Sequence, residues 1–167
     1  QGKVLFEYWF GGGIGGDLDT LKAHPDFPDT PHDSEWRDGM DRPDWDGMDY
    51  FGARGRAFLT APETGEYTFW IASDDDSELW LSTDEDPANA QLIASVEGWT
   101  GYQNWTGSGG APGENRQSAP VALEAGQTYY IETLMSDGTG GGHVSVAWAG
   151  PTVGEEPTLL SGDVLTA

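Results

Sequence analysis

Apolar and polar positions alternate in short runs over most of the chain, a pattern typical of strands with one face turned inward. The first run is KVLFEYWF, at positions 3–10. Further runs follow at near-regular spacing between Gly, Pro and Asn turn signals, at 50–61, 66–73, 77–83, 90–99, 119–125, 127–136 and 143–150, and the tail 158–167 is a candidate to close a sheet. Short strands at this spacing predict an all-β protein built as an antiparallel β-sandwich.

Two of these runs flank PETG at 62–65, which predicts that 50–61 and 66–73 form a hairpin. The alternation in the second run divides its side chains between the two faces of a strand. One face would carry Thr68, Trp70 and Ala72, and the other Tyr67, Phe69 and Ile71.

Only one segment has a helical pattern. Asp17 is a suitable N-cap, Leu18 and Leu21 have i, i+3 spacing, and Pro25 is a stop signal, so one helix of at most two turns is expected. The following stretch, 25–49, is rich in Pro, Asp and Trp. It predicts a long ordered loop, packed on the body and without regular elements.

Composition narrows the function. Asp and Glu number 29 against 7 Lys and Arg, a formal charge of −22 that repels phosphate backbones and anionic lipid headgroups, so nucleic acid and membrane surfaces are unsuitable partners. Cysteine is absent, which excludes disulfides, zinc thiolates and a thiol nucleophile. No run of about 18 apolar residues predicts membrane insertion. The length fits one domain over 1–167, and the abrupt start inside a strand pattern suggests a piece of a larger protein.

Asp74, Asp75 and Asp76 stand side by side at the end of a predicted strand. Carboxylates that converge repel each other unless a cation or proton intervenes, so three neighbours suit a metal site better than the acid and base of a glycosidase. The stretch does not match the EF-hand pattern. It can still supply oxygens to Ca²⁺, which takes six to eight, including carbonyls from Gly-rich loops such as SDGTGGGH at 136–143.

Other signals are weaker. Gly11, Gly13 and Gly16 match a dinucleotide fingerprint, but no second parallel strand follows, so a Gly-rich turn is favoured. The three histidines lack zinc-ligand spacing and are expected to be surface or loop residues: His24, His32 and His143.

Several aromatic residues fall in predicted loops, where they suit either stacking under a sugar or packing onto the body. These are Trp36, Trp45, Trp99, Tyr102 and Trp105.

Three stretches together resemble the protective-antigen-like (PA-fourteen) domain family: FWIASDDDSELWLSTDEDPANAQLIASVEGWT, RQSAPVALEAGQTYYIETLMSDGTGGGHVSVAWAGP and LLSGDVL. The resemblance runs from about Phe6 to Leu165, and the segment 25–49 fits it least. It implies a β-sandwich of the kind found in bacterial adhesins, secreted glycosidases, yeast flocculins and toxins, often as a calcium-dependent carbohydrate binder.

The resemblance also implies a site. In the family's lectins, two adjacent aspartates joined by a cis peptide hold Ca²⁺, and their positions match Asp74 and Asp75, while Asp76 is expected to face solvent or cap the turn. A second loop completes the shell. Here that loop offers Asp137 and the carbonyls around Gly140, Gly141 and His143. Bacterial relatives tend to carry a further aspartate where this chain has Gly142.

The function implied is a non-catalytic, calcium-dependent module that recognises vicinal sugar hydroxyls in a secreted or cell-surface bacterial protein, with His143 and Trp36 or Trp105 shaping specificity. Its partners would be glycans or polysaccharides and neighbouring domains of an adhesin or carbohydrate-active enzyme. Two alternatives stay open. One is a structural or protein-interaction module in which Ca²⁺ only stiffens loops. The other is a polysaccharide-active enzyme in which His24, His32 and His143 converge.

Overall fold

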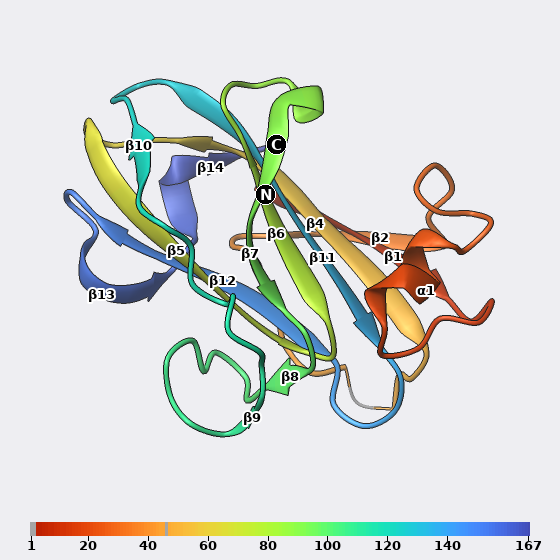
Figure 1. The fold of residues 1–167 in the computed structure, drawn as a ribbon. Coiled ribbons are helices and arrows are strands. Elements are labelled where there is room, and N and C mark those ends of the chain that lie inside the picture. Colours follow the sequence, from red (N-terminus) through yellow and green to blue (C-terminus); the bar gives the residue numbers. More distant parts are fainter. Residues whose placement is uncertain (1–2, 46) are drawn as a thin grey trace.

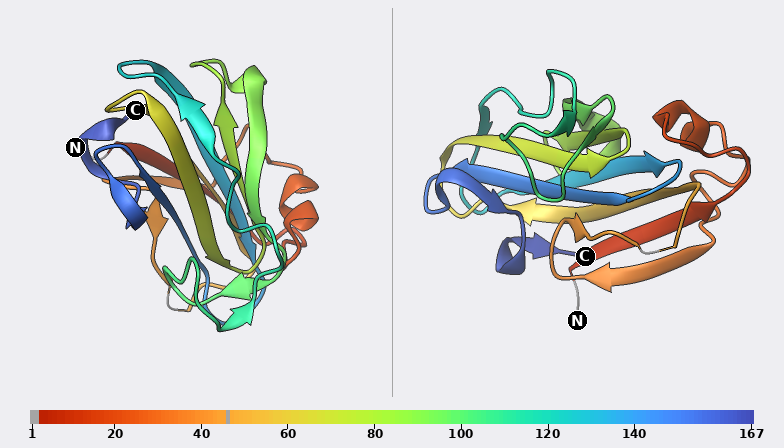
Figure 2. Two further views of the ribbon diagram at one scale, coloured as in Figure 1. Left: turned by 60° about the vertical axis from the view of Figure 1, so that its left-hand side comes forward. Right: turned by 90° about the horizontal axis from the view of Figure 1, so that it is seen from below.

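The computed structural model describes residues 3–45 and 47–167, whose strands form two sheets packed face to face (Figures 1 and 2). The first sheet has the order β2 (Asp33–Arg37), β1 (Val4–Phe10), β4 (Phe51–Thr60), β11 (Thr128–Asp137), β6 (Ser77–Ser82) and β7 (Ala90–Val96), with β14 (Leu165–Thr166) paired to β4. The second has the order β13 (Gly154–Leu159), β12 (His143–Gly150), β5 (Gly65–Asp74), β8 (Trp99–Thr100) and β9 (Gly110–Ala111), with β10 (Val121–Leu123) beside β5 and β3 (Asp41–Arg42) beside β12. Every pairing among the described strands is antiparallel, so the predicted sandwich is confirmed.

The core lies between the two sheets and follows the predicted alternation. Tyr67, Phe69 and Ile71 of β5 are fully buried and belong to the same cluster as Leu59 of β4. The opposite face of β5 carries Trp70, which packs on the outside of the second sheet. Period-two patterning therefore assigned the inward side of this strand correctly.

The predicted hairpin between β4 and β5 is wrong. β4 pairs with β1 and β11 in the first sheet, whereas β5 pairs with β12 and β10 in the second. The segment 61–64 carries the chain across the sandwich from one sheet to the other. Alternation shows which side of a strand is buried but not which strand lies beside it. A hairpin within one sheet and a crossover between two sheets therefore have the same sequence pattern.

The one α-helix of the described residues, α1 (Leu18–Lys22), forms as predicted. The Asp17 carboxylate accepts a hydrogen bond from the backbone N–H of Asp19 at its N-terminus. Leu18 and Leu21 are buried in a small cluster with Trp9 outside the first sheet. Two 3-10 turns complete the elements, η1 (Pro87–Asn89) and η2 (Gly162–Val164). No helix in the described part of the chain has the length and apolarity needed to cross a membrane.

The segment 25–49 departs from its prediction, because it contains β2 and β3 rather than a loop alone. β2 is polar and pairs with β1, and the two residues of β3 pair with β12. Hydrogen bonds from distant strands create both elements, so their own sequence has no apolar alternation to reveal them. The segment thus passes from the edge of one sheet to the edge of the other.

Candidate metal centre

Strand ends from both sheets meet at one end of the sandwich (lower end in Figure 1). β5 ends there at Asp74, β6 begins at Ser77, β11 ends at Asp137 and β12 begins at His143. Since β5 and β6 belong to different sheets, the turn between them closes this end of the core. The Asp74–Asp75 peptide bond in that turn is cis.

The carboxylates of Asp74, Asp75 and Asp137 converge, each offering an oxygen within 4.8 Å of the other two. Hydrogen bonds hold the turn against the end of β11. The backbone N–H of Asp75 donates to the Ser136 carbonyl (2.9 Å), and the Asp75 carboxylate accepts from the backbone N–H of Gly138 (3.1 Å). The two strand ends therefore fix the relative position of the three acids, and Asp76 lies outside their group.

Asp137 is the most unusual member. Its side chain is fully buried, and neither carboxylate oxygen has a hydrogen-bond donor among the described residues. Burial, together with the charges of Asp75, Asp74 and Asp49, raises the pKa of Asp137 to about 8. Burial and its acidic neighbours likewise raise the pKa of Asp74 to about 7. Asp137 and Asp75 can share a hydrogen bond only when one of them is protonated, so without a cation the cluster favours bound protons.

His143 lies beside this cluster, opposite Asp74 in the pairing of β12 with β5. Its side chain is buried, which corrects the expectation of a surface or loop residue. The Nε2 atom lies 3.1 Å from the Thr100 carbonyl, so Nε2 carries a proton and donates it. Burial lowers the pKa of His143, against the opposing effect of Asp44. Gly140 and Gly141 form the adjoining loop, where the Gly140 N–H donates to the Asp49 carboxylate (3.2 Å).

The aromatic residues at the site differ from those chosen from sequence. Trp99 pairs with Asp74 across β8 and β5 and is 46% exposed, while the Tyr102 ring packs edge-on against His143 at 5.6 Å. Trp105 instead packs on the outer face of the second sheet. Trp36 lies on β2, at the edge of the first sheet. A role for Trp36 or Trp105 in sugar binding stays a prediction.

Two acids of the segment 25–49 were missed by sequence reasoning. The Asp49 charge contributes to the raised pKa of Asp137, and the Asp44 charge contributes to that of Asp74. The segment's richness in Asp, Pro and Trp was visible, but nothing in the sequence distinguishes the acids that approach the site from those that face solvent.

His24 and His32 form a second group with Asp26, and their ring centroids lie 5.3 Å apart. His24 Nδ1 accepts from the Asp26 N–H (3.1 Å), and His32 Nδ1 accepts from the Phe10 N–H (3.0 Å). Each neutral ring therefore has its proton on Nε2, whereas a ligating histidine donates from its second nitrogen. This group is not arranged for a metal, and its rings show no interaction with His143 in the described structure, so the three histidines do not form one site.

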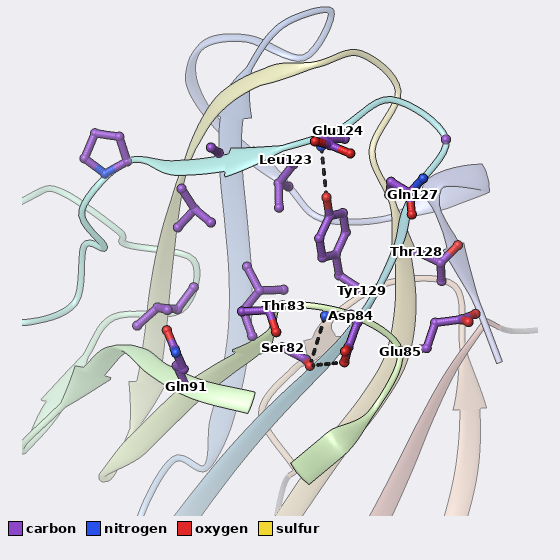
Figure 3. A pocket seen from close by; sticks show the side chains of 16 residues that line it. Ser82, Thr83, Asp84, Glu85, Gln91, Leu123, Glu124, Gln127, Thr128 and Tyr129 are labelled. Atoms are coloured by element: carbon purple, nitrogen blue, oxygen red, sulfur yellow. Dashed lines mark hydrogen bonds between the residues drawn. The ribbon is translucent and has the colours of Figure 1, made fainter. Parts of the chain in front are cut away.

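A pocket of about 880 Å³ lies at the opposite end of β6 and β11 (Figure 3). Two polar side chains of its lining, Asp84 and Tyr129, have protein partners. The Asp84 carboxylate accepts hydrogen bonds from the Asn89 amide (2.9 and 3.1 Å) and from the Ser82 hydroxyl (3.2 Å). The Tyr129 hydroxyl accepts from the Glu124 N–H (2.9 Å). These groups have no need of a ligand, and no site is assigned there.

Comparison with known proteins identifies the family. The model of the PA14 domain matches residues 17–161, which is most of the chain. The chain belongs to the PA14 domain family. The resemblance seen in the sequence is thereby confirmed, and the cis Asp74–Asp75 bond agrees with the geometry that it implied.

Among curated proteins, this PA14 domain is similar to a Mus musculus enzyme named N-acetyl-beta-glucosaminyl-glycoprotein 4-beta-N-acetylgalactosaminyltransferase 1, with 39% identity over 151 residues, or 86% of the chain. Mouse fibrocystin is 33% identical over 84 residues, or 49% of the chain. The chain spans only 13% and 2% of these two proteins.

Solved structures confirm the fold. The PA14 sugar-binding domain of an RTX adhesin aligns over 96% of this chain and 99% of its own, with a TM-score of 0.63 and 15% identity. The Epithelial Adhesin 6 A domain of Candida glabrata, solved in complex with Galb1-3GlcNAc, aligns over 100% of this chain and 88% of its own, with a TM-score of 0.63 and 13% identity. An anti-sigma factor domain-containing protein from Clostridium clariflavum also aligns, with a TM-score of 0.63 and 20% identity, and this chain covers 48% of it.

Proposed function

We propose that this PA14 domain is a non-catalytic, Ca²⁺-dependent carbohydrate-binding module. The observation that carries the proposal is Asp137, a fully buried carboxylate with no donor among the described residues, beside the carboxylates of Asp74 and Asp75. Burying ionised carboxylates together is costly unless a cation neutralises them. The domain maintains this arrangement in its folded state, as expected if a cation is part of the functional form.

The donor set fits calcium. Asp74, Asp75 and Asp137 offer carboxylate oxygens, and the carbonyls of Gly140, Gly141 and His143 are proposed to add backbone oxygens, which suits a hard cation with six to eight ligands. The His143 ring is proposed to position the site rather than to bind the metal. When bound, calcium supplies positive charge and coordination positions open to two vicinal sugar hydroxyls.

Neighbouring side chains suit a sugar. Trp99 exposes an aromatic surface next to Asp74, and the Tyr102 hydroxyl donates to Asp41 (2.7 Å), which holds its ring against His143. Aromatic faces bind the C–H groups of pyranose rings while polar groups fix the hydroxyls. The formal charge of −22 disfavours sulfated and sialylated glycans, so we propose neutral glycans as ligands.

The fold neighbours support the same class of partner, since an RTX adhesin domain described as sugar-binding and a Candida glabrata adhesin solved with Galb1-3GlcNAc share this fold. We further propose that the domain is an appended binding module of a secreted or cell-surface protein, possessing no catalytic role of its own. The similarity to a segment of a mouse glycosyltransferase supports attachment to proteins that act on glycans.

A glycan array probed in calcium and in chelator tests the proposal. Binding should occur only with calcium and should be lost in Asp75→Asn, whereas Asp76→Asn is the matched control because Asp76 lies outside the cluster. Binding that persists in chelator and in Asp75→Asn would overturn the calcium mechanism. A melting temperature raised by calcium without binding to any glycan would favour the structural-module alternative.

A further inference from the structure

The loop between β11 and β12 has no room for the aspartate that the family resemblance leads one to expect at position 142. A Cβ atom on Gly142 would lie 2.8 Å from a ring carbon of Phe51 and 3.0 Å from Cγ of Asp137. A side chain there would have to displace a fully buried aromatic ring. Position 142 therefore supplies no carboxylate to the site in this chain.

Asp44, which lies between β3 and β4, has its carboxylate close to Gly141 of that loop. Its Oδ1 atom lies 3.0 Å from the point where a Cβ on Gly141 would sit, and Oδ2 of Asp74 lies 3.7 Å from the same point. The two carboxylates thus border one small volume above Gly141. A glycine at 141 leaves that volume open.

The residues on either side of Asp44 are anchored, so its position has a structural cause. The Arg42 guanidinium lies over the Trp45 ring at 4.4 Å and donates from Nη1 to the Pro43 carbonyl (3.0 Å). Trp45 packs edge-on against Phe51 at 5.6 Å. These contacts hold the backbone before and after Asp44 against the body, while the Asp44 side chain itself is exposed.

A cluster of acids is not by itself a binding site, but Asp137 is an independent indication of a ligand. It is fully buried within the cluster, and both of its oxygens lack donors among residues 3–45 and 47–167. These oxygens lie beside the carboxylates of Asp74 and Asp75, which repel them unless a proton or a cation lies between, so a cation in the cluster is a partner that fits. Asp44 is not one of the three acids whose oxygens lie within 4.8 Å of one another, but its carboxylate borders that group next to Asp74, above Gly141.

We propose that Asp44 is a further calcium ligand, which replaces the carboxylate that the β11–β12 loop cannot supply. The inference rests on the proposed calcium-dependent function and extends it. The site is then built from three segments of the chain: the β5–β6 turn, the β11–β12 loop and the β3–β4 connection. Calcium would tie Asp44 to the site, next to the surface where a sugar would bind.

Calcium titration calorimetry on the intact domain tests this assignment. Asp44→Asn should weaken calcium affinity on the order of tenfold or more, the scale of losing one supporting group at a metal site. The loss should be as large at 1 M salt as at 0.15 M. A purely electrostatic contribution would shrink at 1 M salt, where the screening length is about 3 Å. A salt-sensitive loss would therefore overturn direct ligation.

Two further variants distinguish direct binding of calcium by Asp44 from a general electrostatic effect of its charge. Gly141→Ala keeps the charge but places a Cβ 3.0 Å from the Asp44 carboxylate, so it should weaken calcium binding, and less so when Asp44 is already Asn. Asp49→Asn removes the same charge from an acid that accepts from Gly140, and it should have a smaller, salt-sensitive effect. Equal effects of Asp49→Asn and Asp44→Asn would refute a specific role for Asp44.

The outcomes also separate this inference from the proposed function. If Asp75→Asn abolishes calcium binding while Asp44→Asn leaves it unchanged, the Asp44 assignment is wrong and the calcium module stands. If the wild-type domain binds no calcium at millimolar concentration, both are wrong. Asp44 is exposed, so the melting temperature of Asp44→Asn without metal should match or exceed that of the wild type and exclude a folding defect.

Discussion

Two aspartates at opposite ends of the sandwich, Asp84 and Asp137, differ in the hydrogen-bond donors that the protein offers to their carboxylates. Asp84, near the 880 Å³ pocket, accepts hydrogen bonds from the Asn89 amide, the backbone N–H of Asp86 and the Ser82 hydroxyl, which lower its pKa despite its exposed position. Asp137 is fully buried without a donor among the described residues, and its pKa is raised to about 8.

This difference in hydrogen bonding is a better indicator of a functional site than the volume of a pocket. At the Asp84 end, the Asn89 amide, the Asp86 N–H and the Ser82 hydroxyl all donate to the carboxylate. At the Asp137 end, the fold holds three carboxylates together and leaves their charge uncompensated. Of these two carboxylates, only Asp137 lacks a donor among the described residues, and the following predictions test that contrast.

The largest expected effect is stabilisation by calcium. At one hundred times its dissociation constant, a ligand that binds only the folded state adds about 2.7 kcal/mol to the free energy of unfolding. For a domain of this size, the melting temperature should rise by roughly 5 to 10 °C. Thermal unfolding should show the full increase in Asp84→Asn and none in Asp75→Asn. An equal rise in melting temperature with calcium in both variants would show that calcium does not bind at the Asp75 end specifically.

Replacing Asp137 and Asp84 by asparagine should change the stability of the metal-free domain in opposite directions. Above pH 8, where Asp137 is ionised without metal, Asp137→Asn removes a buried charge and provides an amide donor for Asp74 and Asp75, so the metal-free domain should gain about 1 to 3 kcal/mol. Asp84→Asn weakens the hydrogen bonds to Asn89 and should lower the melting temperature. Denaturant unfolding in chelator measures both. Destabilisation by Asp137→Asn would show that its carboxylate has a partner in the folded protein.

The pH dependence of folding stability should also have opposite signs in the metal-free and the calcium-bound protein. The folded pKa values of Asp74 and Asp137, about 7 and about 8, lie above the unfolded value of about 3.9, so folding takes up protons. Metal-free stability from these groups is full below pH 4 and is lost as pH rises through 7 to 8. Calcium needs the ionised carboxylates, so its affinity should rise over the same range. Melting curves from pH 5 to 8.5, with calcium and with chelator, check both pH dependences. Asp137→Asn should flatten the fall in metal-free stability with rising pH.

The smallest effects should come from the aromatic residues. Trp99→Ala should weaken glycan affinity about tenfold, the value of one stacking contact of roughly 1.4 kcal/mol, and leave calcium affinity unchanged. Trp36→Ala is a matched control, because both side chains are 46% exposed but only Trp99 pairs with Asp74. A loss in Trp36→Ala but not in Trp99→Ala would support the sequence-based choice of Trp36 instead.

Sequence reasoning recovered the parts of the site that lie close together in the chain. The run Asp74 to Asp76 stood out by its charge, and Asp137 followed from its place in a Gly-rich loop at the matching position of the family. Trp99 and Tyr102 were noted as exposed loop aromatics, but their position beside Asp74 and His143 depends on β8 and β12, which flank β5. Spacing along the chain could not show this, because sheet neighbours are distant in sequence.

The sequence by itself determined the all-β class, the inward faces of the strands, the α1 helix and the acidic turn, because alternation, capping and charge are local properties of a chain. Only the tertiary structure decided that β4 and β5 lie in different sheets, that β2 joins the first sheet and β3 the second, and that the Asp44 and Asp74 carboxylates lie near each other above Gly141. Those facts depend on which strands pair across the fold, and burial of Asp137 without a donor exists only once the pairing is complete.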